Sequence, residues 1–445
     1  MRLEARPRTS LAESSRIARR LVGRCAPVRT VLRRRRRPDQ VDLFVHTALA
    51  SPAFFLDDPT PAPTIVGCGA ATSPEVSIVA AVGELVERVF GSAILMRDAH
   101  HATPRELGAS ALDPQSLAPF SASQRAEPGF PFAPFQADES IAWVRGFDLG
   151  RRQELWVPAE AVYIGAHCRN VHLVSSSSGL AAAATREEAL ASGLYELIER
   201  DAFMIAWAAR RTPPELELAS CPLPEIRDLV GRAEAGRVEL RAFDLTTDVG
   251  VPTVLGVALG SAGQTPSLAV GAASRLSSRG ALGKALLEAL HTWNWTFELV
   301  GARGELAGAA AEPQVRIGDF ADLVYLYAHP WRRRALDFLL VRRELAPVPD
   351  DDPLPRTAAE EVEAIVARLA RAGCRALAAD LSPDPDWGVG LHVVRALSPD
   401  LVPLSLVGTR FYRGCDRYRS VPERLGDPRP PRDESALNTE PHPFP

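Results

Sequence analysis

The sequence predicts an α+β fold in which helices pack on a mixed or antiparallel sheet, with an internal pseudo-duplication. The first indication is a Glu-x-x-Glu-Arg pattern that occurs in two helical segments, Glu84–Arg88 and Glu196–Arg200. The second is a set of helix-start signals, such as the capping box Thr185-x-x-Glu188. The third is a series of short apolar runs bounded by glycine or proline, which are typical of strands.

Start and stop signals predict four main helices. Serine or threonine stands before the first turn of three of them, where its side chain accepts a hydrogen bond from a free backbone N–H. Glycine after the last turn indicates a helix end. The expected helices run from Ser73 to about residue 95, from Thr185 through the second glutamate pair, over about 280–300, and from Thr357 to Gly373.

Short runs of β-formers between turn residues predict the strands. Residues 102–138 are rich in proline, serine and phenylalanine and predict a long ordered surface loop. Residues 175–179 predict a turn of small residues. Strands are expected at 64–66, in a hairpin of 141–149 and 154–158 around Gly150, and near 238–245, 252–258, 267–273, 375–381 and 391–397.

The composition is that of a globular protein. Of 445 residues, 46% are hydrophobic and 24% are charged, and the formal net charge of −4 gives no reason to expect nucleic acid as a partner. Lys284 is the only lysine, which argues against Schiff-base chemistry. The six cysteines form no Cys-x-x-Cys pair, and no window suits a membrane span or a secretory signal. We therefore expect a cytoplasmic protein without disulfides, and we expect His100-His101 at the surface.

Three segments are expected along the chain. Residues 1–60 form a short Arg-rich arm, which includes the run Arg33–Arg37 and is either a solvated arm or an edge strand. Residues 61–426 form the main domain. Residues 427–445 form a proline-rich tail that ends in Pro-His-Pro-Phe-Pro and cannot adopt regular secondary structure.

The two Glu-x-x-Glu-Arg segments are the most informative signal for chemistry. Residues i, i+3 and i+4 share one helical face, so each segment presents two acids and an arginine together. The alternative is a set of solvated ion pairs, each worth about 0.2–0.5 kcal/mol. The small residues before both segments and the apolar residues within them also repeat, which favours a common buried environment. Two such faces opposite each other would form a cage of four carboxylates suited to nucleotide-bound Mg²⁺.

From about Thr64 onward the chain resembles the YcaO family, and its Pro-x-Pro-x-Pro ending resembles the azoline-forming branch. That branch comprises the D-type cyclodehydratase components of thiazole/oxazole-modified peptide biosynthesis. The resemblance is carried by Gly67-Cys-Gly-Ala, by both Glu-x-x-Glu-Arg segments with Asp201, by Ser178-Gly-Leu-Ala-Ala and Thr185-x-x-Glu188-Ala, by Leu286-Leu-Glu288-Ala, by Gly414-x-x-Arg417 with Pro422 and Leu425-Gly426, and by the terminal Pro441-His-Pro443-Phe-Pro445.

The resemblance implies an enzyme that binds ATP and Mg²⁺ between the glutamate-bearing helices. A Cys, Ser or Thr side chain of a ribosomal precursor peptide attacks the preceding backbone carbonyl. ATP then phosphorylates the resulting oxygen, and loss of phosphate leaves a thiazoline or oxazoline. The chemistry is reasonable, because an amide oxygen is a poor leaving group until it is phosphorylated and metal ions neutralise charge on the transferred group.

The resemblance also assigns roles to residues of this chain. Carboxylates would hold magnesium, arginines would pair with phosphates or orient the acids, and the stiff tail would bring its terminal carboxylate into the active site. For the tail, a disordered terminus is the alternative. The expected site residues are Glu84, Glu87, Glu196 and Glu199 for metal and nucleotide, Arg88, Arg200 and Ser178 for the nucleotide, and Glu288, Pro441, Pro443 and Pro445 for catalysis.

Several polar positions depart from the family's pattern. Each change removes a hydrogen bond to nucleotide, magnesium or water, worth about 1–3 kcal/mol where a charged group takes part. All four glutamates are kept, which favours retained nucleotide binding. The departures are Cys68 for lysine, Ala80 for serine, Ser178 for asparagine, Ala184 within the segment that reads Ala-Gly-Asn-Thr in the family, Ser192 for glutamine, and His291 and Trp293 for glutamine and arginine.

Partners follow from the resemblance as well. Only about 60 residues precede the main domain, too few for a fused leader-binding module, so a separate E1-like (ThiF-like) protein is expected to deliver the precursor peptide. A flavin-dependent dehydrogenase and a homodimer are further expectations. Two other functions stay open: a non-catalytic YcaO-like scaffold, which the altered positions favour, and a thioamide-forming enzyme, against which the Pro-x-Pro-x-Pro ending speaks.

Overall fold

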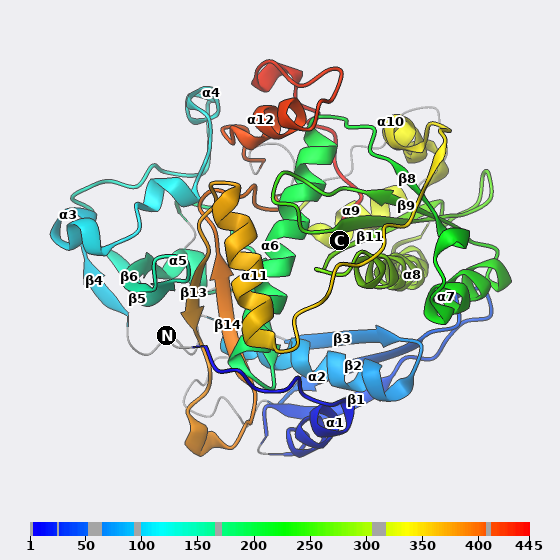
Figure 1. Ribbon diagram of the computed structural model, residues 1–445, viewed down its shortest axis with the longest axis horizontal. Helices are drawn as coiled ribbons and strands as arrows, with labels where there is room; N and C mark the ends of the chain where they lie inside the picture. The colour runs from blue at the N-terminus through cyan, green and yellow to red at the C-terminus, as the bar shows by residue number, and fades with distance from the viewer. Residues whose placement is uncertain are drawn as a thin grey trace. The chain divides into compact units, whose positions relative to one another are not determined.

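The structure is a computed structural model that describes residues 3–24, 26–51, 65–92, 99–164, 171–304, 317–405 and 411–445. Helices and strands alternate along the chain in an α+β fold, as predicted (Figure 1). The chain divides into two compact units. The first comprises Met1–Arg35, Phe44–Leu197 and Pro355–Leu401, and the second comprises Arg36–Leu43, Ile198–Leu354 and Val402–Pro445.

The first unit contains a three-stranded antiparallel sheet in the order β1–β2–β3, with α2 packed on it (Figure 1). The Ser73 side chain accepts a hydrogen bond from Val76 N and so caps α2, as the sequence predicts. The apolar face of α2, which includes Val82 and Leu85, is fully buried in the core of this unit. The elements are α1 (Leu11–Arg20), β1 (Val28–Arg33), β2 (Phe44–Ala50), β3 (Val66–Ala71) and α2 (Pro74–Phe90).

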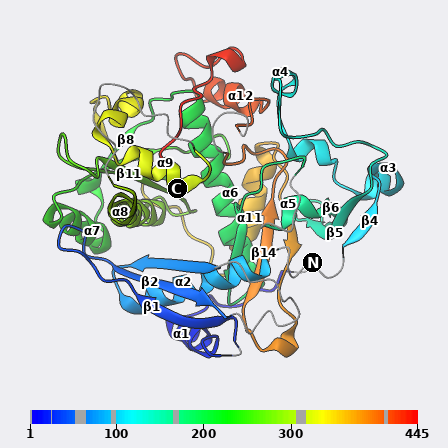
Figure 2. The ribbon, with the colours of Figure 1, turned by 180° about the vertical axis from the view of Figure 1, so that it is seen from behind.

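The second sheet of the first unit is also antiparallel, in the order β4–β5–β13–β14–β7 with β6 paired to β5 (Figure 2). Its strands β5, β6, β13 and β14 agree with the predicted hairpin and late strands. The elements are β4 (His100–Ala102), α3 (Pro104–Leu107), α4 (Ala122–Arg125), β5 (Ile141–Asp148), β6 (Gln153–Pro158), α5 (Ala159–Val162), β7 (Leu180–Ala183), α11 (Ala358–Arg371), β13 (Leu377–Asp380) and β14 (His392–Leu397).

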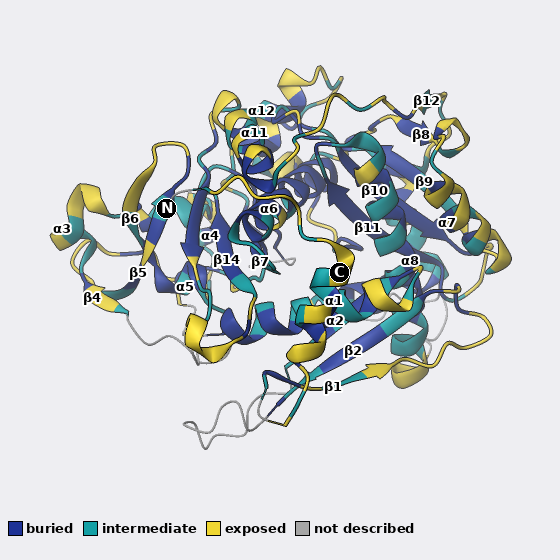
Figure 3. Cartoon of the chain, turned by 60° about the horizontal axis from the view of Figure 1, so that its bottom comes forward, coloured by how far each residue is buried: buried dark blue, intermediate teal, exposed yellow. Residues whose placement is uncertain are grey.

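The second unit is built on a five-stranded mixed sheet in the order β11–β10–β9–β8–β12, in which only β12 and β8 pair in parallel. Strands β10 and β11 are buried along their whole length, with α8 packed on them (Figure 3). The main elements are β8 (Glu215–Glu217), α7 (Pro224–Ala235), β9 (Glu239–Asp244), β10 (Thr253–Leu259), β11 (Leu268–Ser274), α8 (Ser278–Arg303), α9 (Phe320–Tyr327), α10 (Asp337–Leu340), β12 (Leu345–Pro347) and α12 (Arg417–Arg424). Helix α6 (Arg186–Ala208) gives residues 186–197 to the first unit and 198–208 to the second.

One strand–helix arrangement occurs three times. Strands β3, β7 and β11 each lead, after two or three residues, into the long helices α2, α6 and α8. Each helix carries a glutamate ten positions after its first residue: Glu84 after Pro74, Glu196 after Arg186 and Glu288 after Ser278. Ten residues correspond to about 15 Å of helix, so each of these glutamates stands at the same distance from the start of its helix. This repeat is the form that the predicted pseudo-duplication takes.

Parts of the fold differ from the sequence prediction. Within the predicted arm, β1 pairs with β2 and β2 pairs with β3, so β1 is an edge strand, which was one of the two alternatives for this segment. Helix α1, in the same segment, was not predicted. The loop predicted at 102–138 contains the short helices α3 and α4, and α2 ends at Phe90, whereas residues 93–98 lie outside the described part. His100 and His101 are exposed, as expected. In the described part of the chain no helix has the length and apolar character of a bilayer span.

Glycines set how closely β3 approaches α2. A Cβ on Gly69 would lie 2.1 Å from the backbone oxygen of Ser77, and one on Gly67 would lie 2.3 Å from that of Ala81. Helix and strand backbones are therefore in direct contact at both positions. Because rigid backbone atoms cannot move aside as a side chain can, this contact fixes the height of α2 above its sheet.

We predict that Gly69→Ala destabilises the protein by about 2 kcal/mol or more, because the added methyl group overlaps the backbone of α2. The matched control is Gly83→Ala in the middle of α2, where a Cβ meets nothing within 4 Å. That change should stabilise by about 0.5–1 kcal/mol, through helix propensity alone. Urea denaturation of both variants measures the difference, and equal effects would contradict the close contact of β3 with α2.

Candidate functional site

Glu84 on α2 is held by two groups of the first unit. Its Oε2 accepts a hydrogen bond from the backbone N–H of Cys68 on β3 at 2.5 Å. Its Oε1 accepts one from Nε of Arg88 at 3.0 Å and lies 2.5 Å from Nη2 of the same guanidinium. The i, i+4 ion pair expected from the first Glu-x-x-Glu-Arg segment is therefore formed, and it fixes the orientation of both side chains.

Glu87, one turn further along α2, is in a different environment. Burial raises the pKa of Glu87 well above its ordinary value of 4.5, and the negative charges of Glu196 and Glu84 raise it further. Arg88 and Arg395 act in the opposite direction. Among the described residues, no hydrogen bond or ion pair engages the Glu87 carboxylate. Within the first unit, carboxylates of α2 and α6 are thus near enough to repel each other.

Two glycines place α6 beside the second sheet. Gly179, at a positive φ of 85°, would put a Cβ 2.4 Å from the backbone oxygen of Ala396 on β14. A Cβ on Gly193 would lie 2.6 Å from the oxygen of Gly179 and 3.1 Å from the Cβ of Ala396. Helix α6 thus touches the backbone of this sheet three residues before Glu196. That contact determines where the Glu196 carboxylate stands.

Arg395 on β14 is a site residue that the sequence did not reveal. Its side chain is buried, and burial lowers the pKa of its guanidinium to about 10, although the charges of Glu196 and Glu87 act to raise it. Arg395 lies on a strand that is remote in sequence from both glutamates, so no sequence spacing relates it to them. A basic residue in an otherwise apolar strand, Val393-Val-Arg-Ala-Leu397, is the signal that could have identified it.

In the second unit, the continuation of α6 meets the C-terminal tail. Glu199 is buried, and its Oε1 lies 2.9 Å from Nη1 of Arg200. The guanidinium carbon of Arg200 lies 4.4 Å from the centre of the Phe444 ring, a cation–π contact. Phe444 also packs on Phe203 with ring centres 4.5 Å apart. The arginine of the second Glu-x-x-Glu-Arg segment is therefore in direct contact with the tail.

The last residues of the tail, His442, Pro443 and Phe444, are buried, so the alternative of a disordered terminus does not apply to them. His442 donates from Nε2 to the backbone oxygen of Ser405 at 2.9 Å and accepts at Nδ1 from Phe444 N at 3.3 Å. Burial lowers the pKa of His442 to about 4, so the ring is neutral at neutral pH, in the tautomer that these two hydrogen bonds require. The Tyr327 hydroxyl donates to the backbone oxygen of Pro441, and Pro443 is buried.

Two further motif residues form a buried ionic network. Arg417 on α12 donates from Nε and Nη2 to both carboxylate oxygens of Asp201, at 2.7 and 2.6 Å. The same Nη2 also donates to Asp248 at 2.9 Å, and Asp201 accepts from Val402 N at 2.8 Å. Bidentate geometry and complete hydrogen bonding make this a structural link between α6 and the segment before the tail.

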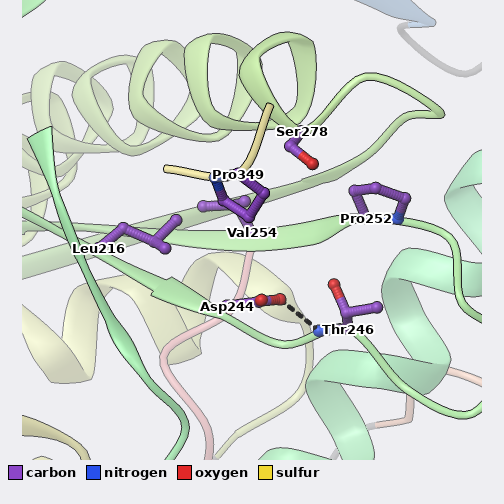
Figure 4. A pocket seen from close by; sticks show the side chains of 7 residues that line it. All are labelled: Leu216, Asp244, Thr246, Pro252, Val254, Ser278 and Pro349. Carbon is purple, nitrogen blue, oxygen red and sulfur yellow. Dashed lines mark hydrogen bonds between the residues drawn. The ribbon is translucent and has the colours of Figure 1, made fainter. Parts of the chain in front are cut away.

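The remaining predicted residues lie elsewhere in their units. In α8 the ammonium of Lys284 pairs with the carboxylate of Glu288, and both side chains are partly exposed. Ser178 is buried in the first unit, where its Oγ accepts a hydrogen bond from Ser176 Oγ at 2.9 Å. A cavity of about 190 Å³ lies in the second unit (Figure 4), and none of the predicted site residues lines it. Its walls are Leu216, Asp244, Thr246, Pro252, Val254, Ser278 and Pro349.

The carboxylates suit a hard cation in chemical type, because Mg²⁺ prefers oxygen ligands and a cation would relieve the repulsion at Glu87. Within the described residues, no three acid, imidazole or thiol groups are close enough to hold a metal by themselves. Glu84 shows why: its oxygens are turned toward Cys68 N and Arg88. Magnesium ligation by Glu84, Glu87, Glu196 and Glu199 stays a prediction.

Comparison with known proteins places these residues in a family. The family model described as YcaO cyclodehydratase, ATP- and Mg²⁺-binding, matches residues 66–402. The chain belongs to the YcaO family. The family's description confirms ATP and Mg²⁺ as the cofactors expected from the resemblance. An uncharacterised protein of Methanothermobacter thermautotrophicus is 33% identical over 153 residues, which are 33% of this chain and 40% of that relative.

Solved structures share the YcaO fold. A heterocyclase in complex with substrate and cofactor matches with a TM-score of 0.81 and 24% identity, over 100% of this chain and 59% of the other. The heterocyclase TruD matches with a TM-score of 0.64 and 25% identity, over 84% and 52%. YcaO from Methanopyrus kandleri, bound with AMPPCP and Mg²⁺, matches with a TM-score of 0.63 and 21% identity, over 87% and 90%. The chain thus spans little more than half the length of the two heterocyclases.

The departures from the YcaO pattern have visible environments. Cys68, in place of lysine, uses its backbone N–H to hold Glu84, and its thiol lies 3.7 Å from Thr47 Oγ1. Burial raises the pKa of this thiol, so it stays protonated. Trp293, in place of arginine, is buried. Its ring packs against Gly260, where an added Cβ would lie only 2.9 Å from the ring. These YcaO positions therefore serve packing and backbone contacts here.

We predict that Glu87→Gln raises the melting temperature of the metal-free protein at pH 8 and has little effect at pH 5. Because folding raises the pKa of Glu87, its protonated carboxyl favours the folded state. This contribution is complete below about pH 4.5, the ordinary pKa, and it is lost as the pH rises through the higher pKa of the folded state. The glutamine side chain of the variant cannot ionise, so the variant does not lose this stability at high pH. Glu75→Gln, an exposed change on the same helix, is the control and should show no such pH dependence. A variant that is less stable than wild type at pH 8 would contradict the unfavourable charge at Glu87.

We predict that Phe444→Ala destabilises the tail by about 3 kcal/mol, because it removes a fully buried ring and the cation–π contact with Arg200. Carboxypeptidase digestion, which requires a released terminus, should be accelerated at least tenfold. Leu425→Ala, at a 38% exposed position in the same unit, should leave the rate unchanged. If both variants are digested at the wild-type rate, the tail is not held by Phe444.

Proposed function

We propose that this chain is an ATP-dependent cyclodehydratase component, which converts Cys, Ser or Thr of a ribosomal precursor peptide to thiazoline or oxazoline by phosphorylating the backbone amide oxygen. The observation that supports the proposal is that the negative charges of Glu196 and Glu84 act on the Glu87 carboxylate, so α2 and α6 contribute a set of like charges. Such a set is unfavourable in a metal-free protein and suits a protein that binds a divalent cation.

The proposed metal ligands are Glu84, Glu87 and Glu196, with Glu199 one turn further along α6. Bound Mg·ATP supplies the phosphoryl group and neutralises the charge that develops on it. In this scheme Arg88 orients Glu84 through their ion pair. Ser178 stands next to Gly179, which adopts a positive φ, and is proposed to contact the nucleotide.

The tail has a separate proposed role. Its prolines restrict the terminal segment, and Phe444 and His442 fix it against α6 and Ser405. Little conformational entropy is therefore left to lose at the last residues when substrate binds. We assign Pro441, Pro443 and Pro445 to this positioning function, with the terminal carboxylate near the reacting amide. Glu288, held by Lys284, is the proposed contact from α8.

Partners follow from the same proposal. A precursor peptide would be delivered by a separate leader-binding, E1-like protein, and a flavin-dependent dehydrogenase would act on the azoline product. The E. coli microcin synthetase McbBCD complex, which shares the fold with a TM-score of 0.59, supports an assembly of several chains. A homodimer is part of the proposal. So is a cytoplasmic location, which the free thiols of Cys68, Cys221, Cys374 and Cys415 support.

A second candidate function is a non-catalytic scaffold in the same kind of pathway. The specific observation in its favour is the packing role of Cys68 and Trp293, where the family carries polar side chains. A scaffold would retain its fold and its partners without turning over ATP. Thioamide formation, the third function, would consume a sulfur donor and would change the product mass differently, so mass spectrometry distinguishes all three.

We predict that the chain, incubated with Mg·ATP, its partner and the precursor peptide, yields products lighter by one water per ring. Glu199→Gln should reduce ring formation at least a hundredfold, because it removes a proposed metal ligand, while the melting temperature stays within a few degrees of wild type. Glu75→Gln is the control. An unchanged peptide mass with an active partner would exclude the cyclodehydratase, and full activity of Glu199→Gln would exclude this metal site.

A further inference from the structure

Arg395 combines deep burial with incomplete hydrogen bonding. Its side chain lies in the middle of β14, and the residue is only 5% exposed. Two of its guanidinium nitrogens, Nε and Nη1, have no hydrogen-bond partner among the described residues. A buried guanidinium without partners is strongly unfavourable, so natural proteins rarely keep one unless a ligand completes its environment.

The strand determines where Arg395 points. Its neighbour Ala396 faces Gly193 of α6, and successive residues of a strand point to opposite faces. Arg395 therefore shares the face of Val393, which packs in the core that α2 forms with this sheet. Glu87 and Glu196 both act electrostatically on Arg395, yet no ion pair within 4 Å joins it to either acid in the described part of the chain.

A simple counter-ion would pair with one of the two acids, since a buried charge gains most from direct contact. Arg395 instead stands beside them with free donors. This arrangement suits a ligand that carries both charges: a metal for the glutamates and a phosphate for the guanidinium, whose planar donors match phosphate oxygens. We propose that Arg395 binds a phosphate group of the nucleotide whose metal ion Glu87 and Glu196 hold. The inference rests on the ATP site of the proposed function and not on the peptide chemistry.

The test uses the full chain and measures binding and stability without peptide. Isothermal titration determines the affinity for Mg·ATP, Mg·AMP, adenosine and inorganic phosphate in wild type, Arg395→Met and Arg395→Lys. Thermal unfolding of each protein is followed without ligand. Arg375→Met is the matched control, because Arg375 belongs to the same unit and pairs with Asp400 through Nε at 3.2 Å, away from the glutamates.

The expected result is that Arg395→Met weakens Mg·ATP binding at least tenfold and leaves adenosine affinity unchanged, with Arg395→Lys in between. Without ligand, Arg395→Met should be as stable as wild type or more stable, because it removes an unpaired buried charge. If Arg395→Met binds inorganic phosphate and Mg·AMP more weakly as well as Mg·ATP, Arg395 recognises any phosphate group. If only Mg·ATP binding is weakened, Arg395 contacts the β- or γ-phosphate.

Three results would overturn the inference. One is unchanged Mg·ATP affinity in Arg395→Met. Another is a ligand-free variant that melts several degrees below wild type and binds normally once folded, which would make Arg395 a structural counter-ion. The third is a wild-type chain that does not bind Mg·ATP. Failure of ring formation with intact, Arg395-dependent nucleotide binding would reject the proposed function and leave this inference standing.

Discussion

The first unit contains an unfavourable interaction, in which the half-buried carboxylate of Glu87 is repelled by those of Glu196 and Glu84. The protein could avoid it by a small separation of α2 and α6, yet the fold prevents this. Gly67 and Gly69 bring β3 into backbone contact with α2, and Gly179 and Gly193 bring α6 onto the turn before β7. Favourable close packing of the backbone therefore holds the carboxylates near one another, where they repel. A divalent cation bound between them would replace this repulsion by attraction to the cation.

The second unit contains a buried ion pair whose charges contact each other directly. Asp201 and Arg417 form a bidentate pair that Asp248 extends, so the buried ions at this part of α6 need no ligand. Arg200 lies over the ring of Phe444, which makes the terminal segment part of the folded structure. Along one helix, α6, the proposed metal ligand Glu196 and the anchoring residue Asp201 are thus only five positions apart.

The sequence predicts local features of the site well and long-range ones poorly. The Glu84–Arg88 pair follows from helix periodicity, and the cap at Ser73 follows from side-chain chemistry. Nothing local reveals Arg395, because strand pairing of β14 with β7 brings it to the glutamates. The proline-rich tail contains one short 3-10 helix, Glu434–Ala436, and the burial of its last residues depends on Tyr327, Phe203 and Ser405, which are remote in sequence. Helix α1 was not predicted, although Ser10 caps its first turn and Glu13 stands in that turn.

The proposed site requires that Glu87 and Glu196 share a divalent cation carried by a nucleotide. The most direct measurement is a crystal structure of the full chain with Mn²⁺ and a non-hydrolysable ATP analogue, in which anomalous scattering locates the metal. We expect anomalous peaks within about 2.5 Å of carboxylate oxygens of both residues. Metal and nucleotide bound elsewhere, for instance in the cavity beside Asp244, with Glu87 and Glu196 unoccupied, would contradict it.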